Sequence, residues 1–161
     1  MTKIHFYRFW AYEDGKLANA ELEEGGVPIN IFVDNAEEYP DLPECDAEIE
    51  IFGASQELEV FETEEAYFAQ GTNMAPKSLI PIGTFGMTGE SKAYTPEPTI
   101  LYSGIVRSVE TREEAAENRP NYLLEVETYG MTFSLYARYD GEIRVGNIVS
   151  GSAWIYGDLS L

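Results

Sequence analysis

Residues 47–53 read Ala-Glu-Ile-Glu-Ile-Phe-Gly, and this alternation of acidic and apolar side chains decides the fold class. Successive side chains of a β-strand point to opposite faces of the sheet. The pattern therefore predicts a strand with one buried face and one wet, acidic face. Residues 58–61 repeat the alternation after a turn near residues 54–56, which predicts a hairpin. Its exposed face would carry five glutamates: Glu48, Glu50, Glu57, Glu59 and Glu62.

The same period of two recurs towards the C-terminus. Residues 131–138 alternate cleanly, and residues 99–110 and 148–156 read as longer strands. Only two short helices are indicated, near residues 63–69 and 112–118. We therefore predict a mainly β chain, an antiparallel barrel or sandwich with one or two short helices. Its core in this half should include Ile105, Leu124, Val126, Phe133, Leu135, Ile148 and Trp154.

Glycines and prolines interrupt the strand pattern over residues 71–98. A chain of 161 residues suits one domain of ordinary size, so we predict a single β-rich domain over residues 1–161. Within it, an acidic part (1–70) and a second part (99–161) would be joined by the 71–98 connection.

The strand layout of the second part resembles an OB-fold barrel over residues 99–157. Gly104 interrupts a long strand, a hairpin follows around Tyr129-Gly130, and the last strand runs between Gly146 and Gly157. OB-folds commonly bind oligonucleotides or oligosaccharides. The resemblance therefore implies an alternative, stacking ligand surface made of aromatic and basic residues: Tyr102, Arg107, Tyr136 and Arg138.

The charge of the chain is strongly negative, at −19. Residues 1–70 hold 18 acidic and 3 basic side chains, whereas residues 71–161 hold 11 and 7. Such a field repels duplex nucleic acid and anionic membranes, because affinity for both comes largely from Lys and Arg. It favours a basic protein partner, although the same charge also serves solubility alone.

Few residues offer catalytic or metal chemistry. The chain has one histidine, His5, and one cysteine, Cys45. A Ser-His-Asp triad would have to use His5 in an aromatic strand, and zinc sites built from several Cys and His cannot form. We therefore expect no catalytic residue, no metal and no cofactor. The N-terminus lacks a signal-peptide core and no stretch approaches about 18 apolar residues, so a cytoplasmic protein that spans no membrane is expected.

These observations rank three functions. The first is a non-enzymatic, acidic protein-interaction module, of the inhibitor or immunity type, that docks a basic protein. The alternative is an OB-like module that binds an oligonucleotide or a sugar. The third is a small hydrolase that uses paired carboxylates, for which no particular pair stands out.

Overall fold

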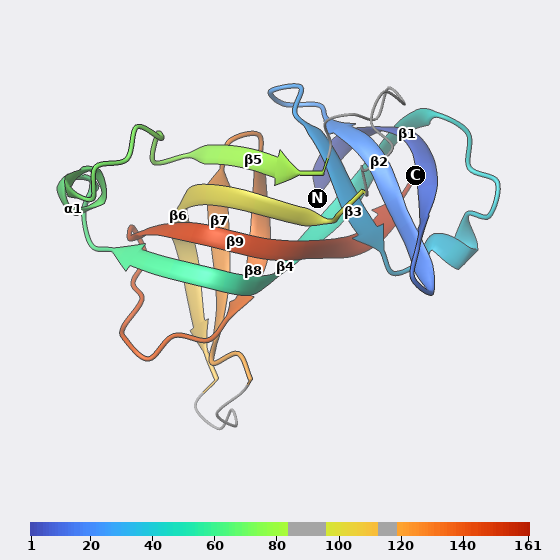
Figure 1. Ribbon diagram of the computed structural model, residues 1–161. Helices are drawn as coiled ribbons and strands as arrows, with labels where there is room; N and C mark the ends of the chain where they lie inside the picture. The colour runs from blue at the N-terminus through green and yellow to red at the C-terminus, as the bar shows by residue number, and fades with distance from the viewer. Residues whose placement is uncertain (84–95, 113–118) are drawn as a thin grey trace.

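The computed structural model describes residues 1–83, 96–112 and 119–161 (Figure 1). Strands dominate these residues, and the predicted mainly β fold is confirmed. Residues 113–118 of the predicted helix and residues 84–95 of the 71–98 connection lie outside the described residues, and the described part of that connection includes a strand, β5 (Ser78–Ile82). The strands are β1 (Thr2–Tyr12), β2 (Gly15–Leu22), β3 (Pro28–Val33), β4 (Cys45–Phe61), β5 (Ser78–Ile82), β6 (Thr99–Thr111), β7 (Tyr122–Thr128), β8 (Met131–Ala137) and β9 (Ile148–Ser160).

All of these strands join one mixed sheet, and two additional strand pairings, β1–β4 and β6–β9, close parts of it into rings. A first ring of pairings runs β1–β2–β3–β9–β4 and closes through β1–β4. A second ring runs β4–β8–β7–β6–β9 and closes through β9–β4. Each ring contains one parallel pair, β3–β9 in the first and β4–β8 in the second. The long antiparallel pair β4–β9 therefore belongs to both rings, which lie on opposite sides of Figure 1.

The predicted hairpin over residues 47–61 is wrong, because β4 is one continuous strand of 17 residues. Its register against β9 shifts between Ser55 and Glu57, where the hairpin turn was expected. A bulge of this kind inserts one extra residue, so that odd-numbered instead of even-numbered residues face outward beyond it. As a result Glu57 and Glu59 stay exposed on the same side as Glu48 and Glu50.

The inner faces of both rings share one hydrophobic core. It takes the inward positions of β4 and β9, including Ile49, Ile51, Ile155 and Leu159, all nearly inaccessible. Of the predicted core residues, five are buried: Leu124, Val126, Phe133, Leu135 and Ile148. Ile105 and Trp154 are only half-buried, which corrects their assignment to the core.

Regular helix is sparse in the described chain. The predicted helix near residues 63–69 is confirmed as α1 (Glu64–Ala69), and the Thr63 hydroxyl accepts a hydrogen bond from the Ala66 amide at 3.1 Å. A single 3-10 turn, η1 (Ala36–Glu38), follows β3. No helix among the described residues is long and apolar enough to cross a membrane.

Candidate protein-interaction face

The outer side of the β4–β9 pair carries an ordered array of side chains. Strand register places Phe52 of β4 opposite Tyr156 of β9, and Tyr156 beside Phe32 of β3. Side chains two residues apart on a strand share a face. Two residues along from this aromatic row, the same face therefore carries Glu50, Asp158 and Asp34.

Six half-buried aromatic rings follow one another across this face, and we call them the aromatic strip: Tyr12, Phe32, Trp154, Tyr156, Phe52 and Tyr136. Neighbouring ring centroids lie 5.2–6.4 Å apart along the series. These separations are those of favourable aromatic pairs. Half-exposed aromatic groups gathered in this way are typical of an interaction surface rather than of a solvated sheet face.

Two features support the aromatic strip, one at Phe32 next to its Tyr12 end and one at its Tyr136 end. A Cβ atom on Gly15 would lie 2.6 Å from Cζ of Phe32, so the absence of a side chain there admits this ring. At the other end, the guanidinium of Arg112 lies 5.0 Å from the centroid of Tyr136. The strip therefore already accepts one cation over an aromatic ring.

Asp34, Asp158 and Glu50 form a second feature, which we call the acidic row. Glu50 and Asp158 face each other directly across β4 and β9, and the Asp34 amide donates to the Gly157 carbonyl at 2.9 Å. Burial, followed by the charge of Asp158, raises the pKa of the Asp34 carboxyl above its ordinary value. Burial is also the main cause that raises the pKa of Tyr156, with Tyr136 and Asp34 adding to it.

The acids in and just before the first part of β4 that face β1 have basic neighbours. His5 contacts Asp46 through Nδ1 at 2.7 Å and Glu44 through Nε2 at 2.8 Å, and Lys3 lies opposite Glu48 in the ladder. The ladder with β1 stops at Ile49, so Glu50 has no β1 partner. Among the residues that the structure describes, no ion pair includes Glu50, Asp34 or Asp158. The acidic row is thus a group of neighbouring carboxylates without an ion-pair partner in the part of the chain that the structure describes.

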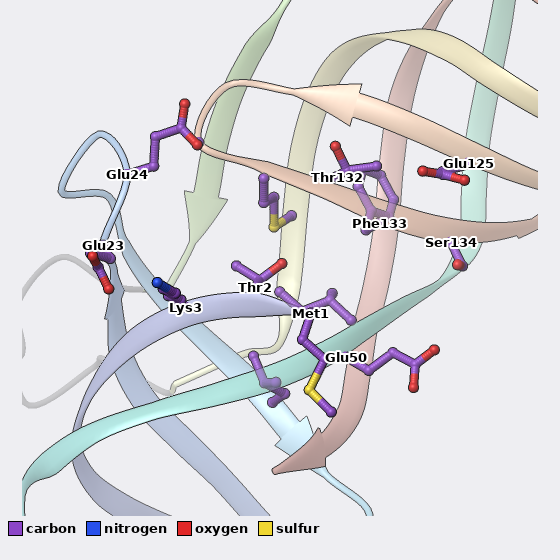
Figure 2. A pocket seen from close by; sticks show the side chains of 14 residues that line it. Met1, Thr2, Lys3, Glu23, Glu24, Glu50, Glu125, Thr132, Phe133 and Ser134 are labelled. Carbon is purple, nitrogen blue, oxygen red and sulfur yellow. The ribbon is translucent and has the colours of Figure 1, made fainter. Parts of the chain in front are cut away.

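A cleft of about 690 Å³ opens beside Glu50. It lies where β4 exchanges one neighbour for another, because β1 pairs with residues up to Ile49 and β8 pairs from Phe52 onward. Figure 2 shows Lys3 towards the side of the cleft that carries Glu23, with Glu50 and Glu125 on the other side. The cleft therefore continues the acidic character of the row.

The five predicted glutamates are all exposed, but they do not form one site. Glu50 belongs to the acidic row and Glu48 lies beside Lys3. Glu57 and Glu59 lie opposite Ser152 and Ser150, beyond the bulge and further along the strand. Glu62 follows the end of β4 and lies near enough to Arg144 to help raise the pKa of that guanidinium, which its hydrogen bond to Glu142 raises most.

The alternative set of ligand residues is also divided. Tyr102 is buried to 1% exposure and packs edge-on against Phe133, so its ring is not on the surface. Arg107 donates to Glu127 at 3.0 Å, and Arg138 lies 3.8 Å from Asp140. Tyr136 alone belongs to the aromatic strip, and the structure does not bring these four side chains together.

Sequence reasoning missed Asp34, Asp158 and most of the strip. A usable signal was present, because an aromatic residue and an acid stand two apart within or at the end of three strands: Phe32 and Asp34, Tyr156 and Asp158, and Glu50 and Phe52. Such a pair places both side chains on one face of its strand. Strand register, which the sequence does not supply, then aligns the three pairs.

The described residues contain no group of three or more His, Cys, Asp or Glu side chains arranged to hold a metal ion. Comparison with family models, curated proteins and solved structures found no match to this chain.

Proposed function

We propose that this chain is a non-enzymatic interaction module that docks a basic protein on the outer face of the β4–β9 pair, as inhibitor and immunity proteins dock their targets. The observation that carries the proposal is the acidic row beside the aromatic strip. A few residues, often Trp, Tyr or Arg, supply most of the binding energy at protein interfaces, while surrounding charges act on orientation and association rate. This face offers both in adjacent rows.

The acidic row argues for a use beyond solubility. Like charges directly opposite each other across two strands destabilise a sheet. Glu50 and Asp158 occupy such a pair, and Asp34 adds a third charge next to Asp158. A solubilising charge could lie anywhere on the surface, whereas these three lie together beside half-exposed rings. A cationic partner would neutralise the row as it covers the strip.

The whole chain supports the same partner chemistry. Its charge of −19 attracts cations over a long range and speeds their association at low ionic strength. We expect the partner to be a basic protein, and the association rate constant to fall steeply as salt rises.

The test compares two variants of equal net charge. The first, Asp34→Asn/Glu50→Gln/Asp158→Asn, neutralises the acidic row. The second, Glu65→Gln/Glu97→Gln/Glu110→Gln, removes three exposed acids elsewhere. Proteins that bind the wild type are captured from the native cell, purified, and measured by surface plasmon resonance. We expect a basic partner whose association slows about tenfold with the first variant and much less with the second.

Equal slowing with both variants would show that net charge alone attracts the partner and would overturn the proposed face. A partner whose binding ignores both variants would overturn the function itself. Phe52→Ser provides an independent arm, because it should speed dissociation without altering the charge.

The aromatic strip also favours a second candidate, the OB-like module. We propose that each ring is an OB-type barrel, in which a three-strand meander is completed by β4 and β9. In the second ring β4 comes from outside residues 99–157, so the resemblance would extend beyond the segment that suggested it. Rings on such a barrel could stack nucleic-acid bases or sugars.

Charge decides between the two candidates. Single-strand binders combine stacking rings with a positive groove, whereas the acidic row would repel phosphates beside this strip. Quenching of Trp154 fluorescence by oligo(dT) or by a neutral oligosaccharide tests the alternative, with Trp10→Phe removing the other tryptophan signal. We expect no saturable quenching at physiological salt, and micromolar binding of either would favour the OB-like candidate.

A further inference from the structure

The acidic row and the aromatic strip run side by side across the strands, and this arrangement limits the shape of what can cover them. The row runs from Asp34, directly after β3, to Asp158 of β9 and Glu50 of β4, and the Asp34 amide still bonds to the Gly157 carbonyl of β9. The strip runs beside it from Tyr12 of β1 over β3, β9 and β4 to Tyr136 of β8. Neighbouring strands lie about 4.8 Å apart. The three carboxylate positions therefore repeat at about 4.8 Å and span roughly 10 Å.

A partner segment must repeat its cations at a similar spacing. An α-helix brings a residue back to the same side every turn, which is about 5.4 Å, and two turns span roughly 11 Å. An extended strand repeats a side at about 6.7 Å, so two steps span roughly 13 Å and overshoot the row. The helical repeat is the closer match to the acidic row.

The two rows also require two kinds of side chain on the partner. The acidic row needs cations, and the adjacent aromatic strip needs apolar groups that remove half-exposed rings from water. An amphipathic helix presents such neighbouring stripes, because residues three and four apart line one face. An arginine stripe fits the carboxylates well, since a guanidinium can bond two oxygens at once. Arg144 does this within the chain, with Nε and Nη2 lying 3.0 and 2.9 Å from the two Glu142 oxygens.

We propose that the basic partner presents an amphipathic α-helix that lies across β3, β9 and β4, with its basic stripe over Asp34, Asp158 and Glu50 and its apolar stripe over the aromatic strip. The inference rests on the proposed function and adds the form of the partner. It also accounts for the close alignment of the two rows, which a diffuse electrostatic surface would not need.

Three synthetic peptides of equal length and charge test the inference. The first places arginines along one helical stripe and leucines along the adjacent stripe. The second is a scrambled sequence of the same residues, and the third is the first with a central proline replacing an alanine. Calorimetry gives each dissociation constant, and far-ultraviolet circular dichroism reports helix formation by the peptide. The mainly β protein itself contributes little helix signal to the spectrum. We expect the first peptide to bind at least tenfold more tightly than the others and to gain helix on binding.

The acidic-row variant and its charge-matched control are titrated with the same peptides. The row variant should lose the tenfold preference, whereas the control variant should keep it. Equal binding of all three peptides, still lost in the row variant, would overturn the helix inference and leave the proposed function standing. Absence of binding by every peptide at low salt would overturn both. A dimer of this chain that shields Trp154 in sedimentation and fluorescence measurements would show that a second copy covers the face, and would also overturn the inference.

Discussion

The inner and outer faces of the β4–β9 pair are made by the same two strands and serve opposite purposes. On the inner face, Ile49, Ile51 and Ile155 are 0–3% exposed and belong to the core that both rings share. On the outer face, the intervening residues are half-buried rings and exposed carboxylates. The inner face therefore determines stability and the outer face is available for binding. Substitutions at neighbouring positions should separate the two roles.

The largest effect should come from the inner face. Ile155→Ala removes a fully buried side chain from the core shared by both rings. A truncation of this kind leaves a cavity and costs about 2–5 kcal/mol. Urea unfolding followed by circular dichroism should show this loss, while partner association should be unchanged under conditions where the variant is folded. A cost below about 1 kcal/mol would mean that the two rings do not share a packed core at this position.

The adjacent residue should behave differently. Trp154 was predicted in the core, but its ring lies on the outer face, 5.2 Å from Phe32 and 5.7 Å from Tyr156. Trp154→Ala loses two aromatic contacts, for which we expect roughly 1–2 kcal/mol. The same change should weaken partner binding strongly, as loss of a central aromatic contact does. If Trp154→Ala destabilised the fold more than Ile155→Ala, the assignment of the two faces would be reversed.

Trp154 also shows where prediction from sequence ends. The alternation in residues 47–53 was sufficient to assign the strand and its inner face, because Glu48 and Glu50 mark the side that faces water. In residues 153–156 all four side chains are apolar or aromatic, so the sequence does not show which alternate pair faces the core. The bulge near Ser55 was interpreted as a hairpin turn, because the small and polar residues there suit either. Only pairing with β9, about 100 residues away, distinguishes them.

The candidate site was less accessible to sequence reasoning than the fold. Glu50 was identified because it alternates with buried isoleucines, but Asp158 lies in β9 and Asp34 directly follows β3. Their proximity depends on the parallel register of β3 with β9, which joins residues more than 120 positions apart. Charge alone also ranked Glu48 with Glu50, although β1 supplies Lys3 opposite one and nothing opposite the other.

A smaller effect is expected from the acidic row itself. Asp158→Asn removes one of two carboxylates that face each other, so it should stabilise the fold by about a few tenths of a kcal/mol. The gain should shrink between low salt and 0.5 M salt, because screening weakens the repulsion. Urea titrations at the two salt concentrations measure it, with Glu110→Gln as the control. A loss of stability at both salt concentrations would show that Asp158 is compensated and that the row is not repulsive.

The smallest effect concerns Asp46 and Glu44, the two acids that contact His5 of β1. Both ring nitrogens of His5 lie within hydrogen-bond distance of a carboxylate, so the charged, doubly protonated ring is favoured. The hydrogen bond to Asp46, followed by that to Glu44, raises the pKa of His5 above 6.5. A raised folded-state pKa means that this interaction contributes fully to stability below the unfolded-state pKa and is lost as pH rises through the folded-state pKa.

As the only histidine, His5 gives a single imidazole signal in an NMR titration. We expect a midpoint above 6.5 that falls in Asp46→Asn and less in Glu44→Gln, whereas Asp158→Asn should leave it nearly unchanged. A wild-type midpoint at or below 6.5 would show that these acids are no better compensated than the acidic row, and the contrast between the acids beside His5 and the acidic row would be lost.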